Sequence, residues 1–347
     1  MVSAIPLEQR AQLFPQSGLD VEYVADDPTA MTFAGADPIT DLDTAADLVV
    51  TLLEARLQAV IEAHPGPVGL MLSGGIDSIL IAGVAARLGM APHAITVITD
   101  TAAGRPDDLR GAEVAAHLGF GHDVLRLNVD RIADAARSCI RRIGTWELWE
   151  ITSAIPNRAA FDRFEELGTG PVLTGAGSDA LFMGGAALAA DPGSDAGLEE
   201  FRSTVTAKVH SNFTRRRLIP DYYERLLGPS AEQFIQVFQT EGFWRLAMSI
   251  HPALLWRPGP DGRIYDKYLL RYAGARIGLP PEFVWTAKAP LQVSSGVVGA
   301  LAESARTDLA RDDDQNTYAD PLTEPIEHTA VRLFLRSLSV TDGEGTP

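Results

Sequence analysis

The stretch from residue 68 to residue 89 constrains the fold of this chain more than any other. Val68 to Leu72 form a short apolar run, as in a buried parallel strand. Ser73-Gly74-Gly75 then break the pattern, and apolar residues recur at helical spacing from Ile79 until Gly89. The sequence therefore predicts a strand, a tight loop and the start of a helix. Such a helix N-terminus presents unpaired N–H groups and the positive end of the helix dipole, which suits phosphate.

The side chains of this loop indicate a phosphate held together with a metal ion. Gly74 and Gly75 let the backbone approach an anion without a Cβ in the way, and Ser73 and Ser78 can donate hydrogen bonds. Asp77 would repel a phosphate unless a magnesium ion lay between them. The loop has no lysine, so it is not the G-x-x-x-x-G-K-S/T phosphate loop. The alternative is an ordinary Gly-Gly turn between a strand and a helix.

Strands and helices alternate through the first half of the chain. Further strands are expected at 94–98, 123–129 and 171–174, and helices at 41–64, 109–118, 130–143 and 155–167. This alternation predicts an α/β fold with a doubly wound parallel sheet, whose ligands bind at the carboxyl ends of the strands. From about Asp191 the pattern favours helices only, at 196–210, 221–226, 231–250, 264–277 and 326–338.

The chain is therefore expected to have four parts. These are an N-terminal arm or cap (1–40), an α/β core (41–190), a mainly helical part (191–340) and a flexible tail (341–347).

Composition and charge narrow the classes of partner. A net charge of −17 argues against a nucleic-acid partner, because phosphate backbones are held by basic surfaces. No apolar run approaches the ~18–20 residues of a membrane span, and the N-terminus does not resemble a signal peptide. Cys139 is the single cysteine, which excludes an intramolecular disulfide and an all-cysteine metal site. We expect a cytoplasmic protein.

A second glycine-rich turn follows the fourth expected strand. It reads Gly175-Ala176-Gly177-Ser178-Asp179, so a strand again runs into a turn that carries an aspartate. Asp179 can face Asp77 across the edge of the sheet, and two carboxylates there would chelate magnesium. The alternative for Asp179 is a helix N-cap.

These two motifs resemble a known family. The loop from Ser73 to Ser78 resembles the S-G-G-x-D-S pyrophosphate loop of the N-type ATP pyrophosphatases. Together with Gly175 to Gly185 it resembles the synthetase domain of the asparagine synthetase and β-lactam synthetase family, and the resemblance covers about 41–300, including Asp266 to Arg271 and Lys288. It implies an ATP pyrophosphatase type of fold, with ATP and Mg²⁺ in the site. It also implies that a substrate carboxylate attacks the α-phosphorus, pyrophosphate leaves, and an amine or ammonia then displaces AMP.

The resemblance also implies roles for particular residues. Asp77 and Asp179 would hold Mg²⁺, and Lys288 would place a positive charge near the phosphates and the developing oxyanion, unless it is a surface lysine. Lys267 and Arg271 have the same candidate role, or else line a solvated helix face. The expected ATP contacts are Leu72, Ser73, Gly74, Gly75, Asp77, Ser78, Val97, Thr99, Gly175, Lys267 and Lys288.

Three features depart from the family pattern. Val2 stands where the family's glutaminase domain has its catalytic cysteine, and few residues precede the loop, so we expect no glutamine hydrolysis by this chain. Ala176 stands where asparagine synthetases have glutamate and β-lactam synthetases have tyrosine; Glu147 or Glu150 would then be the general base, or the amine arrives unprotonated. The R-x-P-F-L-D segment of the family is not visible. The candidate pocket walls, or else core residues, are Trp146, Trp149, Phe182, Met183 and Trp244.

The main hypothesis is an AMP-forming amide synthetase with Lys288, Asp77, Asp179 and Glu147 as catalytic residues. Its substrates would be a small-molecule or peptide carboxylate and an amine or ammonia, in specialised metabolism such as antibiotic biosynthesis, and a homo-oligomer is possible. A second hypothesis is another adenylating member of the superfamily, either a sulfur transferase or a nucleotide amidase. A third is a non-catalytic nucleotide-binding partner subunit, which Ala176 motivates.

Overall fold

A computed structural model describes Phe33 and residues 37–100, 106–214, 219–287, 289–312 and 319–341. Within these residues five parallel strands form one sheet in the order β3-β2-β1-β4-β5. The strands are β1 (Gly69–Met71), β2 (His93–Thr99), β3 (His122–Leu127), β4 (Val172–Thr174) and β5 (Phe234–Gln236). Leu70 pairs with Ala94 on one side and with Leu173 on the other. The prediction of a doubly wound parallel sheet is confirmed.

Later strands are added to the sheet on both sides of the central strand β1. Helices α3 (Ile76–Arg87) and α4 (Pro106–Leu118) lead to β2 and β3. Helices α5 (Ile132–Ile143) and α6 (Leu148–Glu166) then lead to β4, on the other side of β1. The strand order therefore reverses between β1 and β4, where open α/β sheets have their ligand crevice. Both glycine motifs lie directly after these two strands.

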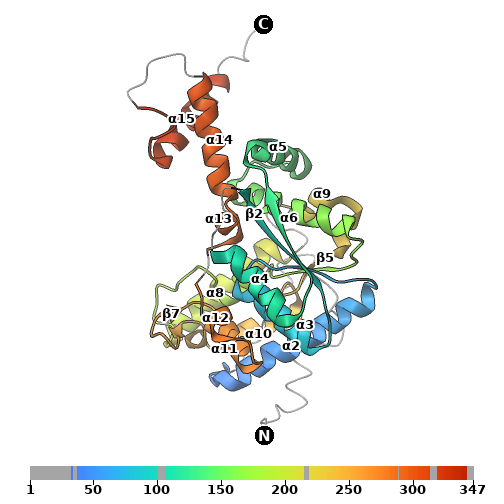
Figure 1. Ribbon diagram of the computed structural model, residues 1–347. Coiled ribbons are helices and arrows are strands. Elements are labelled where there is room, and N and C mark those ends of the chain that lie inside the picture. The colour runs from blue at the N-terminus through green and yellow to red at the C-terminus, as the bar shows by residue number, and fades with distance from the viewer. Residues whose placement is uncertain are drawn as a thin grey trace.

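The two faces of the sheet build two separate hydrophobic cores, as alternation along a strand requires. Leu70 and Leu173 pack in the core that includes α2 (Leu42–Ala63) and α3. Met71 and Val172 pack in the other core, with side chains of α5, α6 and α9 (Tyr222–Leu227). Figure 1 shows these helices on opposite sides of the sheet. The site lies at the edge of this sheet, which is packed between the two cores.

The second half of the chain is mainly helical, as predicted, but it also completes the sheet. The prediction of a helix over 231–250 is wrong in its first part, because residues 234–236 form β5, which pairs with β4. Phe234 packs into one core and Ile235 into the other, which is why this short segment is extended. A three-residue strand inside an apolar run cannot be told from a helix by periodicity. The helical remainder of that segment is α10 (Glu241–Ser249).

The remaining elements surround this frame. The helices are α7 (Ser178–Phe182), α8 (Asp195–Asn212), α11 (Tyr268–Arg276), α12 (Pro281–Val284), α13 (Leu291–Ser294), α14 (Val297–Asp312) and α15 (Ile326–Thr341). The 3-10 helices are η3 (Val129–Arg131), η4 (Gly228–Gln233) and η5 (Pro252–Leu254), and β6 (Arg257–Pro258) forms a hairpin with β7 (Ile264–Tyr265). In Figure 1, α14 and α15 project from the sheet, away from the N-terminal end.

Most of the expected N-terminal arm, and residues 342–347 of the expected tail, lie outside the described residues. Of the arm, Ile39 forms a bridge with Ile250, and the ring of Phe33 meets that of Trp244 edge-on. None of the described helices combines the length and the apolar character that a membrane span needs.

Candidate active site

The first glycine loop is held open toward the crevice. Gly74 has φ of 75°, which favours glycine, and its carbonyl accepts a hydrogen bond from buried Arg110 at 3.1 Å. Gly75 is the N-cap of α3, and no side chain caps this helix end. The N–H groups of its first turn are therefore available to a ligand. Ser78 Oγ donates to the Gly75 carbonyl at 3.1 Å and lies 3.2 Å from Ser73 Oγ. The loop therefore has the geometry of an anion site.

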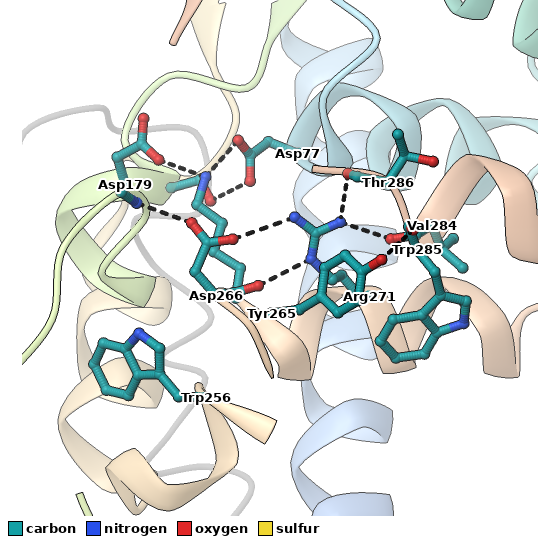
Figure 2. A network of polar contacts seen from close by, with 12 residues as sticks. Asp77, Asp179, Trp256, Tyr265, Asp266, Arg271, Val284, Trp285 and Thr286 are labelled. Carbon is teal, nitrogen blue, oxygen red and sulfur yellow. Dashed lines mark hydrogen bonds and ion pairs between the residues drawn. The ribbon is translucent and has the colours of Figure 1, made fainter. Parts of the chain in front are cut away.

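The aspartates of the two motifs converge on one ammonium group. Lys267 Nζ lies 2.6 Å from Asp77 Oδ2 and 2.5 Å from Asp179 Oδ1. Figure 2 shows Asp77 and Asp179 reaching this contact from opposite sides. Ser178 Oγ also donates to Asp77 Oδ1 at 2.6 Å. The predicted meeting of Asp77 and Asp179 across the sheet edge is thus what the structure shows, with a lysine as the shared cation.

Lys267 is fixed in this position by the backbone and by its neighbours. It is the N-cap of α11 in the left-handed conformation, with φ of 48°. Burial alone would lower the pKa of Lys267, but the charges of Asp77 and Asp179 outweigh burial and hold the pKa above its ordinary value. A Cβ at Gly184 would collide with Asp179 Oδ1 and Lys267 Cε, so a larger residue there would force both side chains to move. Lys267 is 5% exposed and does not line a solvated face.

Arg271 serves a structural purpose one helical turn away. Its guanidinium donates to the carbonyls of Val284 at 2.7 Å and Thr286 at 3.0 Å, and to the Asp266 carboxylate at 3.3 Å. Asp266 also accepts from the Gly185 amide at 2.9 Å (Figure 2). Arg271 is 4% exposed, so it too is no solvated side chain. These bonds tie α11 to the second glycine motif and to the segment that leads toward residue 288.

A first cavity of about 280 Å³ lies along this constellation. Its lining includes Ser73, Gly75, Asp77, Ser78, Gly175, Ala176, Asp179, Lys267, Arg271 and the segment 289–292. Leu72, Gly74, Val97 and Thr99 were expected to contact ATP but do not line this cavity; Val97 and Thr99 are buried in β2. Lys288 lies outside the described residues, although its neighbours 289–292 line the cavity. The proposed role of Lys288 stays a prediction.

A second cavity of about 210 Å³ adjoins the first and shares Ser153, Ala176, Asp179 and Tyr223 with it. Glu150 lines the second cavity. Glu147, the expected base, instead accepts a hydrogen bond from the Glu150 amide at 2.8 Å as the N-cap of α6. Of the five candidate pocket walls, Phe182, Met183 and Trp244 are buried in a core, and Trp146 and Trp149 are more than half exposed.

Most of the other residues that line the second cavity were not anticipated from the sequence, and four of them come from α9 and from β5 or the residues after it. Tyr222 and Tyr223 begin α9, and Gln236 and Gln239 end or follow β5. Recognising Phe234 to Gln236 as a strand would have shown that the residues after it reach the same sheet edge as the two glycine motifs.

The comparison with known proteins agrees with the motifs. The sequence pattern described as Asparagine synthase matches residues 55–249, more than half of the 347 residues. The chain belongs to the asparagine synthase family. It is 30% identical over 280 residues to a glutamine-hydrolyzing asparagine synthetase of Triphysaria versicolor, covering 76% of this chain and 45% of that protein. With a similar enzyme of Brassica oleracea it shares 29% over 244 residues, 67% of this chain and 39% of the other.

This family member spans less than half the length of these two relatives. Among solved structures, an NMN synthetase from Francisella tularensis matches 85% of this chain and 94% of its own, with a TM-score of 0.38 and 14% identity.

Proposed function

We propose that the protein is an ATP-dependent, AMP-forming amide synthetase that activates a carboxylate as an acyl-adenylate. One observation carries the proposal: Asp77 and Asp179, from two separate glycine motifs, converge on a single cation in a cavity that also contains the Ser73–Ser78 loop. This arrangement suits a nucleotide whose phosphates lie on the loop and at the α3 N-terminus. The family to which the chain belongs supports the same reaction class.

The two aspartates fit a magnesium ion on the phosphates. Their carboxylates reach a common point, and carboxylate oxygen is the ligand that Mg²⁺ prefers. Among the described residues, no group of three or more His, Cys, Asp or Glu side chains is arranged to hold a metal ion. The remaining ligands would therefore be phosphate oxygens and water, as Mg²⁺ usually requires in nucleotide sites. Magnesium would neutralise phosphate charge there, and Lys267 would contribute a second positive charge beside it.

The reaction then needs two steps. The substrate carboxylate oxygen attacks the α-phosphorus of ATP, and the bond to the β-phosphate oxygen breaks, which gives the acyl-adenylate and pyrophosphate. An amine or ammonia then attacks the acyl carbon, AMP leaves with the bonding electron pair, and the amine loses a proton. Glu150 lines the cavity beside Ala176 and is better placed to accept that proton than Glu147, which caps α6.

The setting of this reaction is part of the proposal. The carboxylate would be a small molecule or a peptide from specialised metabolism, such as antibiotic biosynthesis, and the enzyme would act in the cytoplasm as a homo-oligomer. The net charge of −17 supports substrates other than nucleic acid.

Exchange of labelled pyrophosphate into ATP tests the first step. With Mg²⁺ and a panel of carboxylic acids, we expect exchange that depends on the acid, and at least a hundredfold loss in Asp77→Asn. Products that contain ADP and never AMP would refute the proposal. The chief competing function is a non-catalytic nucleotide-binding subunit, which Ala176 favours because the family's base is missing there. That function predicts ATP binding without exchange for every acid.

A further inference from the structure

The second cavity contains a buried polar group with no bonding partner. Gln239 lines this cavity and is 2% exposed. Its Nε2 has no hydrogen-bond partner among the described residues. Buried polar atoms in native proteins are almost always paired, so an orphaned donor in a cavity wall requires an explanation. An acceptor on a bound ligand would supply the missing partner.

Gln239 stands beside the turn in which the family's usual base is replaced by Ala176. A Cβ built at Gly177 would lie 3.1 Å from the backbone nitrogen of Gln239 and 3.3 Å from the Cβ of Gln239, so the two backbones are in close contact. Gly177 also has φ of 93°, which favours glycine. The cavity that Gln239 lines shares Ala176 and Asp179 with the first cavity. A ligand in the second cavity would therefore lie next to the place where the acyl-adenylate forms.

The polar lining of the second cavity suits an amide group. Asn212, Gln236 and Gln239 contribute primary amides, each of which can donate and accept, and Ser153 and Ser211 contribute hydroxyls. Such side chains match the N–H and C=O of an amide, since each can satisfy one of them. A purely hydrocarbon acid would leave the Gln239 donor without a partner.

We propose that Gln239 is a specificity-determining residue that donates a hydrogen bond to a carbonyl oxygen of the acyl substrate, and that this substrate is a carboxylic acid bearing an amide, as in an N-acylated amino acid or a peptide. The inference rests on the proposed function, because it assigns the second cavity to the acid that is adenylated. It goes further by naming the chemical class of that acid. No covalent step involves Gln239.

The test separates a binding role from a structural one through Gln239→Leu, which keeps the size of the side chain and removes the donor. If Gln239 Nε2 bonds only to a bound substrate, Gln239→Leu leaves the melting temperature of the free protein unchanged or raises it, because a buried donor without a partner is removed. If the donor bonds within the protein, the melting temperature falls. The control is Gln236→Leu in the same wall, whose side-chain amide is not among the buried groups without a partner, and it should lower the melting temperature.

Specificity is measured by pyrophosphate exchange with two matched acids, N-acetylglycine and its hydrocarbon isostere 4-methylpentanoate, and then with a panel of N-acetyl amino acids. We expect the wild type to prefer the amide-bearing acids by about tenfold or more, and Gln239→Leu to bring the ratio close to one. A wild-type preference for the hydrocarbon acid, or a Gln239→Leu variant with the preference intact, overturns the inference and leaves the proposed function standing. Absence of exchange with every acid refutes both, and the melting temperatures still decide whether the Gln239 donor is orphaned.

Discussion

The residue that most defines the site is Lys267, because its ammonium group contacts the aspartates of both glycine motifs. Its side chain is 6% exposed and that of Asp77 is 20% exposed, whereas that of Asp179 is 71% exposed. Removing one partner of a buried ion pair usually costs about 3–5 kcal/mol, because the other charge stays buried. We expect Lys267→Met to lower the free energy of unfolding by about 3 kcal/mol, the lower end of that range, since solvent screens Asp179.

This substitution makes a second prediction possible from the same variant. Without the lysine, the two carboxylates form an empty cation site, so millimolar Mg²⁺ should raise the melting temperature of Lys267→Met more than that of the wild type. Denaturant unfolding and thermal scans with and without Mg²⁺ measure both effects. Equal responses of the two proteins to Mg²⁺ would contradict the assignment of Asp77 and Asp179 to a metal. Lys208→Met is the control, because Lys208 lies close enough to Asp179 and Lys267 for their charges to affect its pKa.

At the scale of single residues, the sequence predicted the positions of the two carboxylates better than the position of the lysine that joins them. Asp77 and Asp179 each follow a strand by a glycine turn, so parallel topology alone places them at one edge. Lys267 is 190 positions beyond Asp77, and its place depends on a left-handed backbone at the start of α11. A non-glycine residue with positive φ has no clear signature in a sequence. The sequence therefore indicated that Lys267 belongs to the site but not that it joins both aspartates.

At the scale of elements, His122 couples β3 to the strand that carries the first glycine loop. Its Nε2 lies 2.8 Å from Thr96 Oγ on β2, and Thr96 Oγ donates to the Leu72 carbonyl at 2.6 Å. Burial lowers the pKa of His122 below its ordinary value of 6.5; the charge of Asp123 opposes this shift and that of His93 adds to it. Below pH 6.5 the unfolded chain therefore binds this proton more readily than the folded chain.

It follows that the free energy of unfolding should fall as the pH drops from 6.5 through the lowered pKa of folded His122, and then level off. His122→Asn removes this titration while leaving a side chain that can bond to Thr96. Urea unfolding at several pH values between 7.5 and 5 should thus show a smaller loss of stability in the variant than in the wild type. Parallel curves for the two proteins would assign the pH dependence to other groups.

The long helices with a repeated apolar pattern were predicted, and so were the three-residue strands β1 and β4, each of which runs into a glycine motif. The 16-residue helix α14 and the three-residue strand β5 were not predicted. The long helices at 42–63 and 195–212 repeat their apolar residues over several turns, so their sequence signal is strong. β5 has only Phe234 to Gln236 and is extended because β4 lies beside it. Tertiary context thus decided its conformation, and the cavity residues after it were missed for the same reason.

At the scale of the whole molecule, stability is concentrated around the sheet and not in the projecting helices. The helices α2 and α3 are buried along their inner faces against the central strands, where Leu48, Leu52 and Leu80 have at most 2% exposure. On α15, by contrast, Val331, Phe334, Leu335 and Leu338 are 47–61% exposed. A fully buried side chain gains about 1.5–3 kcal/mol from burial, whereas an exposed one gains little.

Two phenylalanines provide a matched comparison of these regions. Phe243 on α10 is fully buried in the core that includes α2, and Phe334 on α15 is 61% exposed. Phe243→Ala should lower the free energy of unfolding by about 3–5 kcal/mol, because it removes buried apolar surface and leaves a cavity. Phe334→Ala should change it by no more than about 0.5 kcal/mol. Denaturant titrations of both variants decide the matter: a large loss for Phe334→Ala would mean that the exposed stripe of α15 is buried in solution by another surface.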